Sequence, residues 1–350
     1  MLLYDAKSGA SMGAGVLKSI SKRWLKKALV RSSILGLAGQ LARPSAAILM
    51  YHSVVEDPNL TDHVLGVSRD RASFEAHMEI LARHFSPVAI DEVTQFAKSS
   101  RELPRRAVAV TFDDGFADNY EVALPILNRY GIPAAFYIMV DAVANGVLPW
   151  YCRLRFAFNT TNKCEWQDLE RNRTYSLISP QERRVALTAA WETGARATGA
   201  VQQNFVDGVE ESLEVEPASP GHGSMLNWEQ VRSLRKLGHT IGAHTLSHPN
   251  VAQVSQSEAR FEILESKKRL EAELGEPIEH FSYPHPALNP QWSEQTLQIT
   301  REAGFQSAVL TTRGPVRAGD EPLALKRINT PADLDQFAFN VECTFLGRSV

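Results

Sequence analysis

The architecture of this chain follows from one stretch, Ala107-Val108-Ala109-Val110-Thr111-Phe112-Asp113-Asp114-Gly115. Its first six residues are apolar or β-branched and indicate a buried strand. Two carboxylates and a glycine follow where the strand ends and the chain must turn. Adjacent carboxylates at the end of a buried strand cost desolvation energy and repel each other unless a cation or a proton offsets their charge. The simpler alternative is a strand that runs into a solvated Asp-Asp-Gly turn.

The composition is that of a globular protein. Of the 350 residues, 44% are hydrophobic and 22% are charged, which is enough apolar material for a sizeable core. The formal net charge of −3 argues against a nucleic-acid partner. The 3 cysteines lack C-x-x-C spacing and indicate buried thiols, neither a disulfide framework nor a thiolate metal site.

Residues 1–45 form a basic extension that carries eight lysines and arginines against one acid, Asp5. Between Val16 and Ala42 the pattern allows a basic amphipathic helix, which would lie on an anionic membrane surface. The apolar run from Ile34 to Leu41 is too short to span a bilayer and makes a poor signal-peptide core. We expect an extension that is flexible or packed on the domain of a cytoplasmic protein. Peripheral contact with the inner membrane is the alternative.

Strands and helices alternate along the rest of the chain, and six or seven such strands predict a parallel α/β sheet. Strands are expected at 46–53, 107–112, 134–140, 239–244, 278–285, 306–311 and 323–328, with a short one at 87–90. Helices are expected at 74–84 with Ser73 as N-cap, 91–98, 121–130, within 180–199, after the N-cap Asn227, at 257–274, at 293–303, and from Thr330-Pro331 onward.

The alternation stops between about 146 and 224, where one helix and an acidic segment at 207–224 are the main features. We expect this stretch to be a mostly helical or irregular insertion within a single catalytic domain spanning 46–345, with part of it disordered.

Polar groups collect at the predicted strand ends, namely His52, Asp113, Asp114, His244 and His285. In a β/α barrel these ends share one face, where catalytic residues gather. This grouping favours a barrel over an open sheet. No G-x-G-x-x-G or Walker pattern follows any strand, which argues against nucleotide binding.

A second motif, His244-Thr245-Leu246-Ser247-His248, follows another strand directly. Its two imidazoles are four residues apart, so on a helical turn or tight loop both reach one ion. Two histidines and a strand-end carboxylate leave open positions on Zn²⁺ or another divalent ion, which is typical of a catalytic site. Such an ion would polarise a substrate carbonyl and lower the pKa of its water to about 7. One aspartate would then bind the ion and the other would serve as base.

Together, Thr111-Phe112-Asp113-Asp114-Gly115 and His244-Thr245-Leu246-Ser247-His248 resemble the motifs of the polysaccharide deacetylases, the NodB-homology or carbohydrate esterase 4 family. The resemblance covers roughly residues 46–328 without the insertion. It implies a distorted (β/α) barrel that hydrolyses N-acetyl, sometimes O-acetyl, groups on a poly- or oligosaccharide. It also implies Asp114, His244 and His248 as ligands of a divalent metal, with Zn²⁺ expected and Co²⁺ or Ni²⁺ as alternatives, and Asp113 as general base.

The later motifs depart from the family pattern. Phe281-Ser282-Tyr283-Pro284-His285 keeps the proline of the usual Arg-x-Pro-Tyr segment, but Ser282 occupies the arginine's slot and His285 the tyrosine's. This variant resembles the branch associated with bacterial exopolysaccharide synthesis. The family's Leu-x-His appears as Leu325-Lys326-Arg327, without the histidine that supplies the acid.

Another group must therefore protonate the leaving amine. Met50-Tyr51-His52 resembles the strand that places a histidine at the active site of some relatives, so His52 is assigned as acid. A core histidine bonded to backbone is the alternative for His52, and His285 is the rival acid. Arg327 is a candidate to replace the missing arginine beside Asp113. Residues assigned to substrate binding are Tyr283, Pro284, His285, Arg327 and Trp150.

Two further interpretations stay open. One is a carbohydrate-binding or scaffold protein of polysaccharide biosynthesis whose active site has decayed, which the departures in the later motifs would explain. The other is a glycosidase with Asp113 and Asp114 as its carboxylate pair. Adjacent residues on one strand end are awkward for the opposed placement that glycosidases need, and the two histidines would be unexplained. Trp150 and Tyr151, which begin the insertion, either stack on sugar rings or pack within the insertion.

Overall fold

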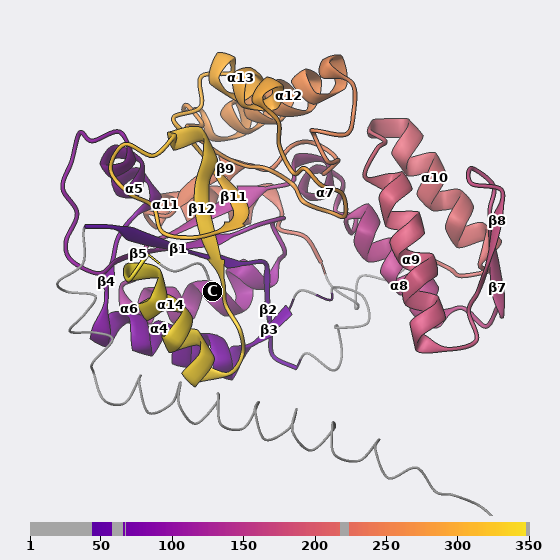
Figure 1. Cartoon of the computed structure of the whole chain (residues 1–350), viewed down its shortest axis with the longest axis horizontal. Helices are drawn as coiled ribbons and strands as arrows, with labels where there is room; N and C mark the ends of the chain where they lie inside the picture. Colours follow the sequence, from indigo (N-terminus) through magenta and orange to yellow (C-terminus); the bar gives the residue numbers. More distant parts are fainter. Residues whose placement is uncertain (1–43, 58–65, 67, 218–223, 348–350) are drawn as a thin grey trace, which may run out of the picture.

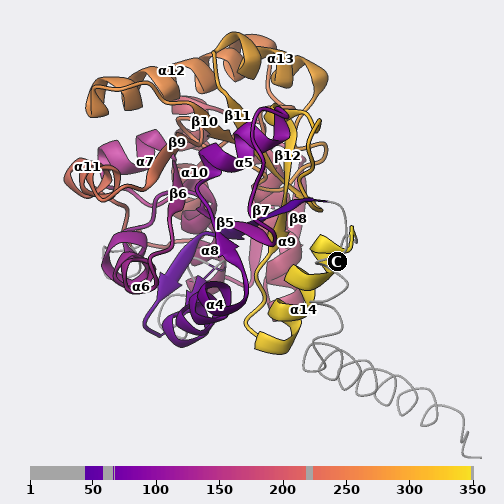
Figure 2. The ribbon, with the colours of Figure 1, turned by 90° about the vertical axis from the view of Figure 1, so that its left-hand side faces the viewer.

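A closed barrel of parallel strands organises the chain (Figures 1 and 2). The structure is a computed structural model that describes residues 44–57, 66, 68–217 and 224–347. The ring consists of β1 (Ala46–Tyr51), β12 (Leu325–Asn329), β11 (Ser307–Arg313), β10 (His280–Ser282), β9 (Thr240–Ala243), β6 (Ala134–Ile138) and β5 (Ala107–Phe112), in that order. Pairing of β1 with β5 closes it, and every pairing in the ring is parallel. The short β4 (Ser86–Pro87) pairs with β5 outside the ring. The expected (β/α) barrel is confirmed.

Side chains alternate between two apolar layers because successive residues of a strand point to opposite faces. Ala46, Ile48, Ala107 and Ala109 belong to one buried cluster, which α5 (Ile90–Ala97) closes at one end. Their sequence neighbours on β1 and β5 belong to the larger cluster beneath the outer helices. The interior of the ring therefore combines small alanines with larger apolar residues such as Tyr137 and Leu325. By the same alternation, every second side chain toward the end of β5 also points into the ring.

Except for α7, which was not predicted, the outer helices match the predicted positions within a few residues. They are α4 (Arg71–His84), α6 (Leu124–Tyr130), α7 (Val140–Asn145), α11 (Trp228–Lys236), α12 (Gln256–Leu274), α13 (Glu294–Glu302) and α14 (Leu334–Phe345). A π-helical turn, η1 (Asn119–Ala123), precedes α6, so these two elements together fill the helix predicted at 121–130. Short strands β2 (Ser53–Val55) and β3 (Ser68–Asp70) pair beside the barrel.

Two predicted helix starts were wrong, and in both an aspartate is the cap. The helix α4 begins at Arg71 because the Asp70 carboxylate accepts from Ser73 N at 2.8 Å, so Ser73 is not the N-cap. The helix α14 begins at Leu334, after Pro331, because Asp333 accepts from Gln336 N at 2.9 Å. An aspartate is both a strong cap and a negative charge at the positive end of the helix dipole.

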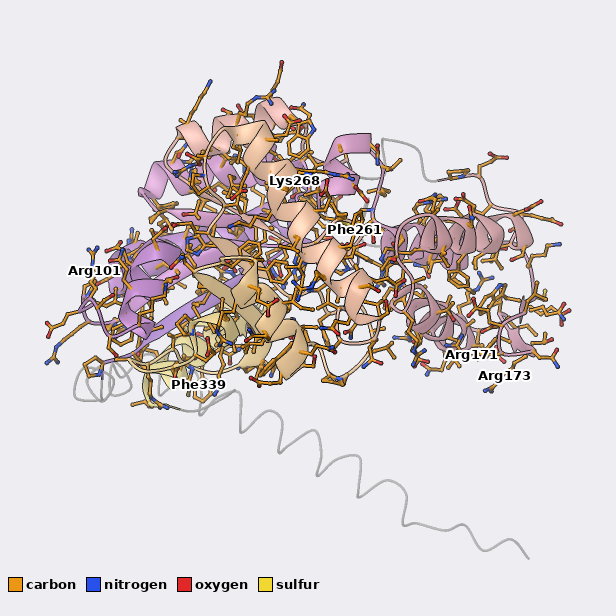
Figure 3. All side chains as sticks on the ribbon, turned by 90° about the horizontal axis from the view of Figure 1, so that it is seen from above. Arg101, Arg171, Arg173, Phe261, Lys268 and Phe339 are labelled. Carbon is orange, nitrogen blue, oxygen red and sulfur yellow. The ribbon has the colours of Figure 1, made fainter. Side chains whose placement is uncertain are left out.

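The insertion forms its own helical layer at one side of the barrel (Figures 1 and 3). It contains α8 (Trp150–Thr160), the hairpin of β7 (Glu165–Asp168) and β8 (Arg173–Ser176), α9 (Pro180–Gly194) and α10 (Gly199–Ser212). Figure 3 shows Arg171 and Arg173 of the hairpin at the outer edge of this layer. The insertion is more ordered than the sequence suggested, since part of the acidic segment, 207–212, lies in α10.

The basic extension at 1–45 lies almost wholly outside the described residues, so its predicted membrane contact stays a prediction. Within the described part of the chain, the helices fall short of the length and apolar character that a membrane span requires.

Candidate active site

The end of β5 carries the two carboxylates in a strained turn. The main chain takes a left-handed conformation at Asp114 (φ 78°) and at Gly115 (φ 86°). A side chain at 115 would place its Cβ 3.3 Å from Val143 Cγ2, so glycine suits this position on both counts. Positive φ at an aspartate is uncommon and costs of order 1–3 kcal/mol, a strain that clusters at functional sites.

Asp114, His244 and His248 come together as a buried group whose potential ligand atoms all lie within 4.8 Å of one another. The Nε2 atoms of His244 and His248 lie 3.4 Å and 3.5 Å from Asp114 Oδ1. His244 Nδ1 is 2.7 Å from the carbonyl oxygen of Ser282, which can only accept, so Nδ1 donates and Nε2 is the atom that faces Asp114. Burial would lower the pKa of His244, but the carboxylates of Asp113 and Asp114 raise it. Burial, reinforced by His244, lowers the pKa of His248 to about 3 and keeps its imidazole neutral.

This arrangement fits a cation better than it fits an apolar core. Asp114 Oδ1 is buried and accepts no hydrogen bond within the described part of the chain. It faces the Nε2 atoms of His244 and His248, and a buried carboxylate so placed needs a positive charge beside it, either a proton on an imidazole or a cation. A neutral imidazole fixed by a bond from its other nitrogen is the usual state of a histidine ligand. The three residues therefore suit a divalent metal.

The loop between the histidines is held from both sides. Thr245 and His248 have φ of 63° and 59°, and Thr245 Oγ1 accepts from His248 N at 3.0 Å. The buried carboxylate of Glu262, on α12, accepts from Leu246 N and Ser247 N at 2.9 Å each and from Ser247 Oγ at 2.6 Å. The motif is thus a tight loop, not a helical turn, and Glu262 compensates for its strained backbone.

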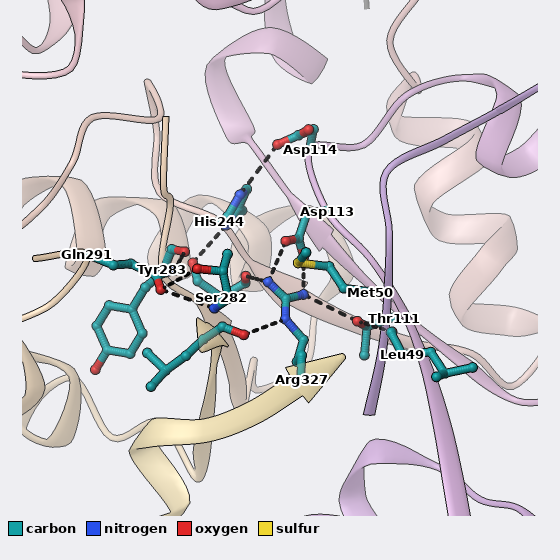
Figure 4. Close-up of polar contacts among 12 residues, drawn as sticks. Leu49, Met50, Thr111, Asp113, Asp114, His244, Ser282, Tyr283, Gln291 and Arg327 are labelled. Carbon is teal, nitrogen blue, oxygen red and sulfur yellow. Dashed lines mark hydrogen bonds and ion pairs between the residues drawn. The ribbon is translucent and has the colours of Figure 1, made fainter. Parts of the chain in front are cut away.

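Arg327 holds Asp113 from the other side of the barrel (Figure 4). Its Nη1 and Nη2 donate to Asp113 Oδ1 and Oδ2 at 2.8 Å and 2.7 Å, and both residues are buried. Burial alone would raise the pKa of Asp113, but the Arg327 guanidinium holds it below its ordinary value. Asp113 is therefore ionised at neutral pH. Arg327 stands where the sequence made it a candidate to replace the missing arginine.

A cavity of about 210 Å³ lies over these groups. Its wall includes His52 and His285 from the barrel, together with Tyr151, Arg155 and Trp191 from the insertion. His52 also lines a neighbouring cavity of about 490 Å³. The structure thus brings His52 to the same space as both aspartates and both histidines of the candidate metal site.

Other residues expected at the substrate occupy different places. Tyr283 contributes to the cavity wall, but its hydroxyl donates to Thr300 Oγ1 at 3.0 Å, away from the opening. Pro284 is buried and is not among the residues that line the cavity. Trp150 is 4% exposed and its indole donates to His248 O at 3.2 Å. Trp150 therefore braces the histidine loop, contrary to the expected sugar stacking, and its neighbour Tyr151 faces the cavity.

Three comparisons with known proteins bear on this site. The sequence profile described as polysaccharide deacetylase matches residues 100–173 and 180–308, more than half of the chain. The chain belongs to the polysaccharide deacetylase family. A Bacillus subtilis protein named as a polysaccharide deacetylase, YxkH, is 20% identical over 293 residues, which are 83% of this chain and 74% of that protein. A chitooligosaccharide deacetylase from Azorhizobium caulinodans is 34% identical over 70 residues, 20% of this chain and 31% of that protein.

Solved structures share the fold of this deacetylase. Streptococcus pyogenes deacetylase PplD, in complex with acetate, matches with a TM-score of 0.57 at 18% identity, covering 87% of this chain and 99% of PplD. IcaB from Ammonifex degensii matches with a TM-score of 0.56 at 17% identity, covering 86% of this chain and 98% of IcaB. Family membership makes the protein a deacetylase hydrolase of a family that acts on acetylated polysaccharide, and the glycosidase interpretation is set aside.

Proposed function

We propose that this deacetylase removes acetyl groups, principally N-acetyl groups, from a poly- or oligosaccharide in a metal-dependent hydrolysis. One observation carries the proposal. A buried carboxylate that Arg327 keeps ionised lies beside Asp114, His244 and His248, beneath an open cavity. Such a pairing of an ionised base with a potential metal site is unnecessary for stability and suits the hydrolysis of an amide.

Asp114, His244 and His248 would hold the ion, with Zn²⁺ the expected metal. A divalent cation there supplies Lewis-acid polarisation of the acetyl carbonyl and acidifies a nearby water molecule. Asp113 would take the proton of the attacking water. Each carboxylate oxygen has two lone-pair sites, and Arg327 uses one on each, so acceptor capacity remains toward the cavity.

His52 is our proposal for the acid that protonates the leaving amine. Its side chain is half-buried and lines the cavity, while its backbone oxygen accepts from Asn119 Nδ2 at 2.7 Å. That bond fixes the backbone of the residue at the end of β1 and leaves the imidazole to the substrate. His285, which bonds Asn289 Oδ1 through Nε2 at 3.1 Å, is held by the loop after β10 and is the second candidate.

The test separates the base from the metal ligands. Asp113→Asn should abolish acetate release while the purified protein keeps its zinc, whereas His248→Ala should lose both. Acetate release is measured on N-acetylated and O-acetylated glycans of matched length, and metal content by elemental analysis. Full turnover by Asp113→Asn would refute the assigned base. Faster release from O-acetylated glycans would refute the N-acetyl preference.

A further inference from the structure

Two arginines line the cavities around His52 and form no ion pair with a carboxylate among the described residues. Arg155, on α8, borders the smaller cavity above the metal-binding residues, and Arg69, on β3, borders the larger one. Among the described residues neither guanidinium forms an ion pair, although most arginines of this chain that are described here do. The Nε atoms of both are buried and lack a hydrogen-bond partner within that part of the chain.

The guanidinium of Arg155 is held between two neighbouring residues. Its guanidinium lies 4.8 Å from the centre of the Trp191 ring, an arrangement that holds the planar group by cation–π attraction. On its other side is Gly66, which also lines the larger cavity. A Cβ at 66 would come within 2.3 Å of Arg155 Cζ, and Gly66 has φ of 64°. A residue without a side chain is therefore required for the guanidinium to reach between the two cavities.

The nearby carboxylates cannot neutralise Arg155. The charge of Asp113 is paired with that of Arg327, and Asp114 faces the two histidines where a cation would bind. A metal ion at that site would add positive charge beneath Arg155 and repel it. A partly buried guanidinium with an unpaired N–H, placed beside a cation site, is costly unless an anion binds there. Within the part of the chain that the structure describes, no carboxylate forms an ion pair with Arg155, which makes a bound ligand a candidate source of that anion.

We propose that the sugar substrate is anionic, and that a carboxylate or phosphate close to the acetylated sugar binds Arg155. Arg69 would bind a second such group farther along the polysaccharide. This inference rests on the proposed deacetylation and adds the substrate class. Arginine suits both anions because its planar fork matches two oxygens at once. Because His52 lines both cavities, a polymer that occupied both would pass the catalytic residues with charged sugars on both sides.

The experiment compares ligands that differ only in charge. Zinc-loaded full-length protein is titrated calorimetrically with a heparosan tetrasaccharide, which alternates glucuronate with N-acetylglucosamine, and with its carboxyl-reduced form. N-acetylglucosamine 1-phosphate and the neutral methyl glycoside form the phosphate arm. We expect at least one charged ligand to bind roughly tenfold more tightly than its neutral counterpart, with the advantage shrinking as salt rises. If the charged ligand binds more tightly in only one of the two arms, that arm identifies the anion as a carboxylate or a phosphate.

Variants assign the preference to its residue. Arg155→Gln should lose most of the charge preference and Arg69→Gln part of it. Arg184→Gln, which removes an exposed arginine from α9 of the same insertion, should keep the preference. Arg155→Lys keeps the charge and should retain a reduced preference, which guards against a folding defect in Arg155→Gln. Equal binding of charged and neutral ligands by the wild type, or an unchanged preference in Arg155→Gln, overturns the inference. Absence of acetate release with the charge preference intact would instead overturn the proposed function alone.

Discussion

Replacing Arg327 with methionine tests how the base is kept ionised. In the wild type all five N–H groups of the guanidinium donate. Two bind Asp113, and the others bind Thr111 Oγ1 at 3.2 Å, Ser282 Oγ at 3.3 Å and Leu310 O at 2.9 Å. Methionine keeps much of the aliphatic volume but leaves the 2% exposed carboxylate of Asp113 without a partner. Removing one member of a buried ion pair costs about 3–5 kcal/mol, so we expect a loss of that size at pH 8.

The pH dependence of this loss follows from the sign of the pKa change. In the wild type the pKa of Asp113 lies below its unfolded value, so the ion pair stabilises the fold above that value and loses its effect as pH falls through the folded pKa. Without Arg327, burial raises the pKa of Asp113 above the unfolded value. Stability of Arg327→Met should therefore fall as pH rises, and the penalty should be smaller at pH 5 than at pH 8. The acidic limb of kcat/KM should shift to higher pH because the base must be ionised.

Urea unfolding at pH 5 and pH 8 measures the first effect, and acetate release across the same range measures the second. Lys326→Met is the matched control, since Lys326 is the exposed neighbour on β12. The double variant Arg327→Met/Asp113→Asn should regain part of the stability at pH 8, because no buried charge remains. It should lack activity because the base has been removed. If Arg327→Met stayed within about 1 kcal/mol of the wild type at pH 8 and kept its acidic limb, the reasoning would fail.

Two other predictions concern residues outside the cavity. Glu262→Ala removes the acceptor for two loop amides and the Ser247 hydroxyl, so zinc affinity measured by chelator competition should fall roughly 10–100-fold; an effect equal to that of Glu265→Ala on the same helix would contradict it. Burial lowers the pKa of His77 to about 3 in the fold, so the unfolded chain binds more protons below pH 6.5 and stability falls as pH falls. Between pH 7 and pH 5 this amounts to about 2 kcal/mol, which His77→Gln should abolish and the exposed His84→Gln should not, as measured by urea unfolding.

The barrel and the grouping of its candidate metal ligands were predictable because their signals are local. Alternating apolar residues such as Ala107 to Phe112 identify strands by period, and a buried strand that ends in carboxylates has few alternatives to a cation. The histidine spacing adds the remaining ligands. Helix starts failed at Asp70 and Asp333 because several polar residues in a row could each act as cap, and only the backbone decides among them.

The residues that support the site could not be predicted from the sequence, because their roles depend on contacts between distant parts of the chain. Glu262 is one of five glutamates on α12, and nothing in the order of residues marks it as the one that turns inward to the histidine loop. Arg155 likewise looks like any charged residue of an amphipathic helix. Trp150 and Tyr151 are adjacent aromatics, and their opposite roles depend on which face of α8 meets the barrel.

Arg327 shows how a motif can be kept in space while it is lost in sequence. Leu49 of β1 is level with Val110 of β5 on one side and with Ile328 of β12 on the other. Thr111 is therefore level with Asn329, two residues beyond Arg327, and both Thr111 and Arg327 point into the ring from strands about two strand spacings apart. A long arginine spans that gap to reach Asp113, and the small Ser282 in the family's arginine slot leaves room for it and lies 3.3 Å from its Nη2. Compared position by position with the family motifs, the sequence lacks one arginine and one histidine. In the closed barrel, the arginine that stands at the histidine's position takes the place of the missing arginine beside Asp113.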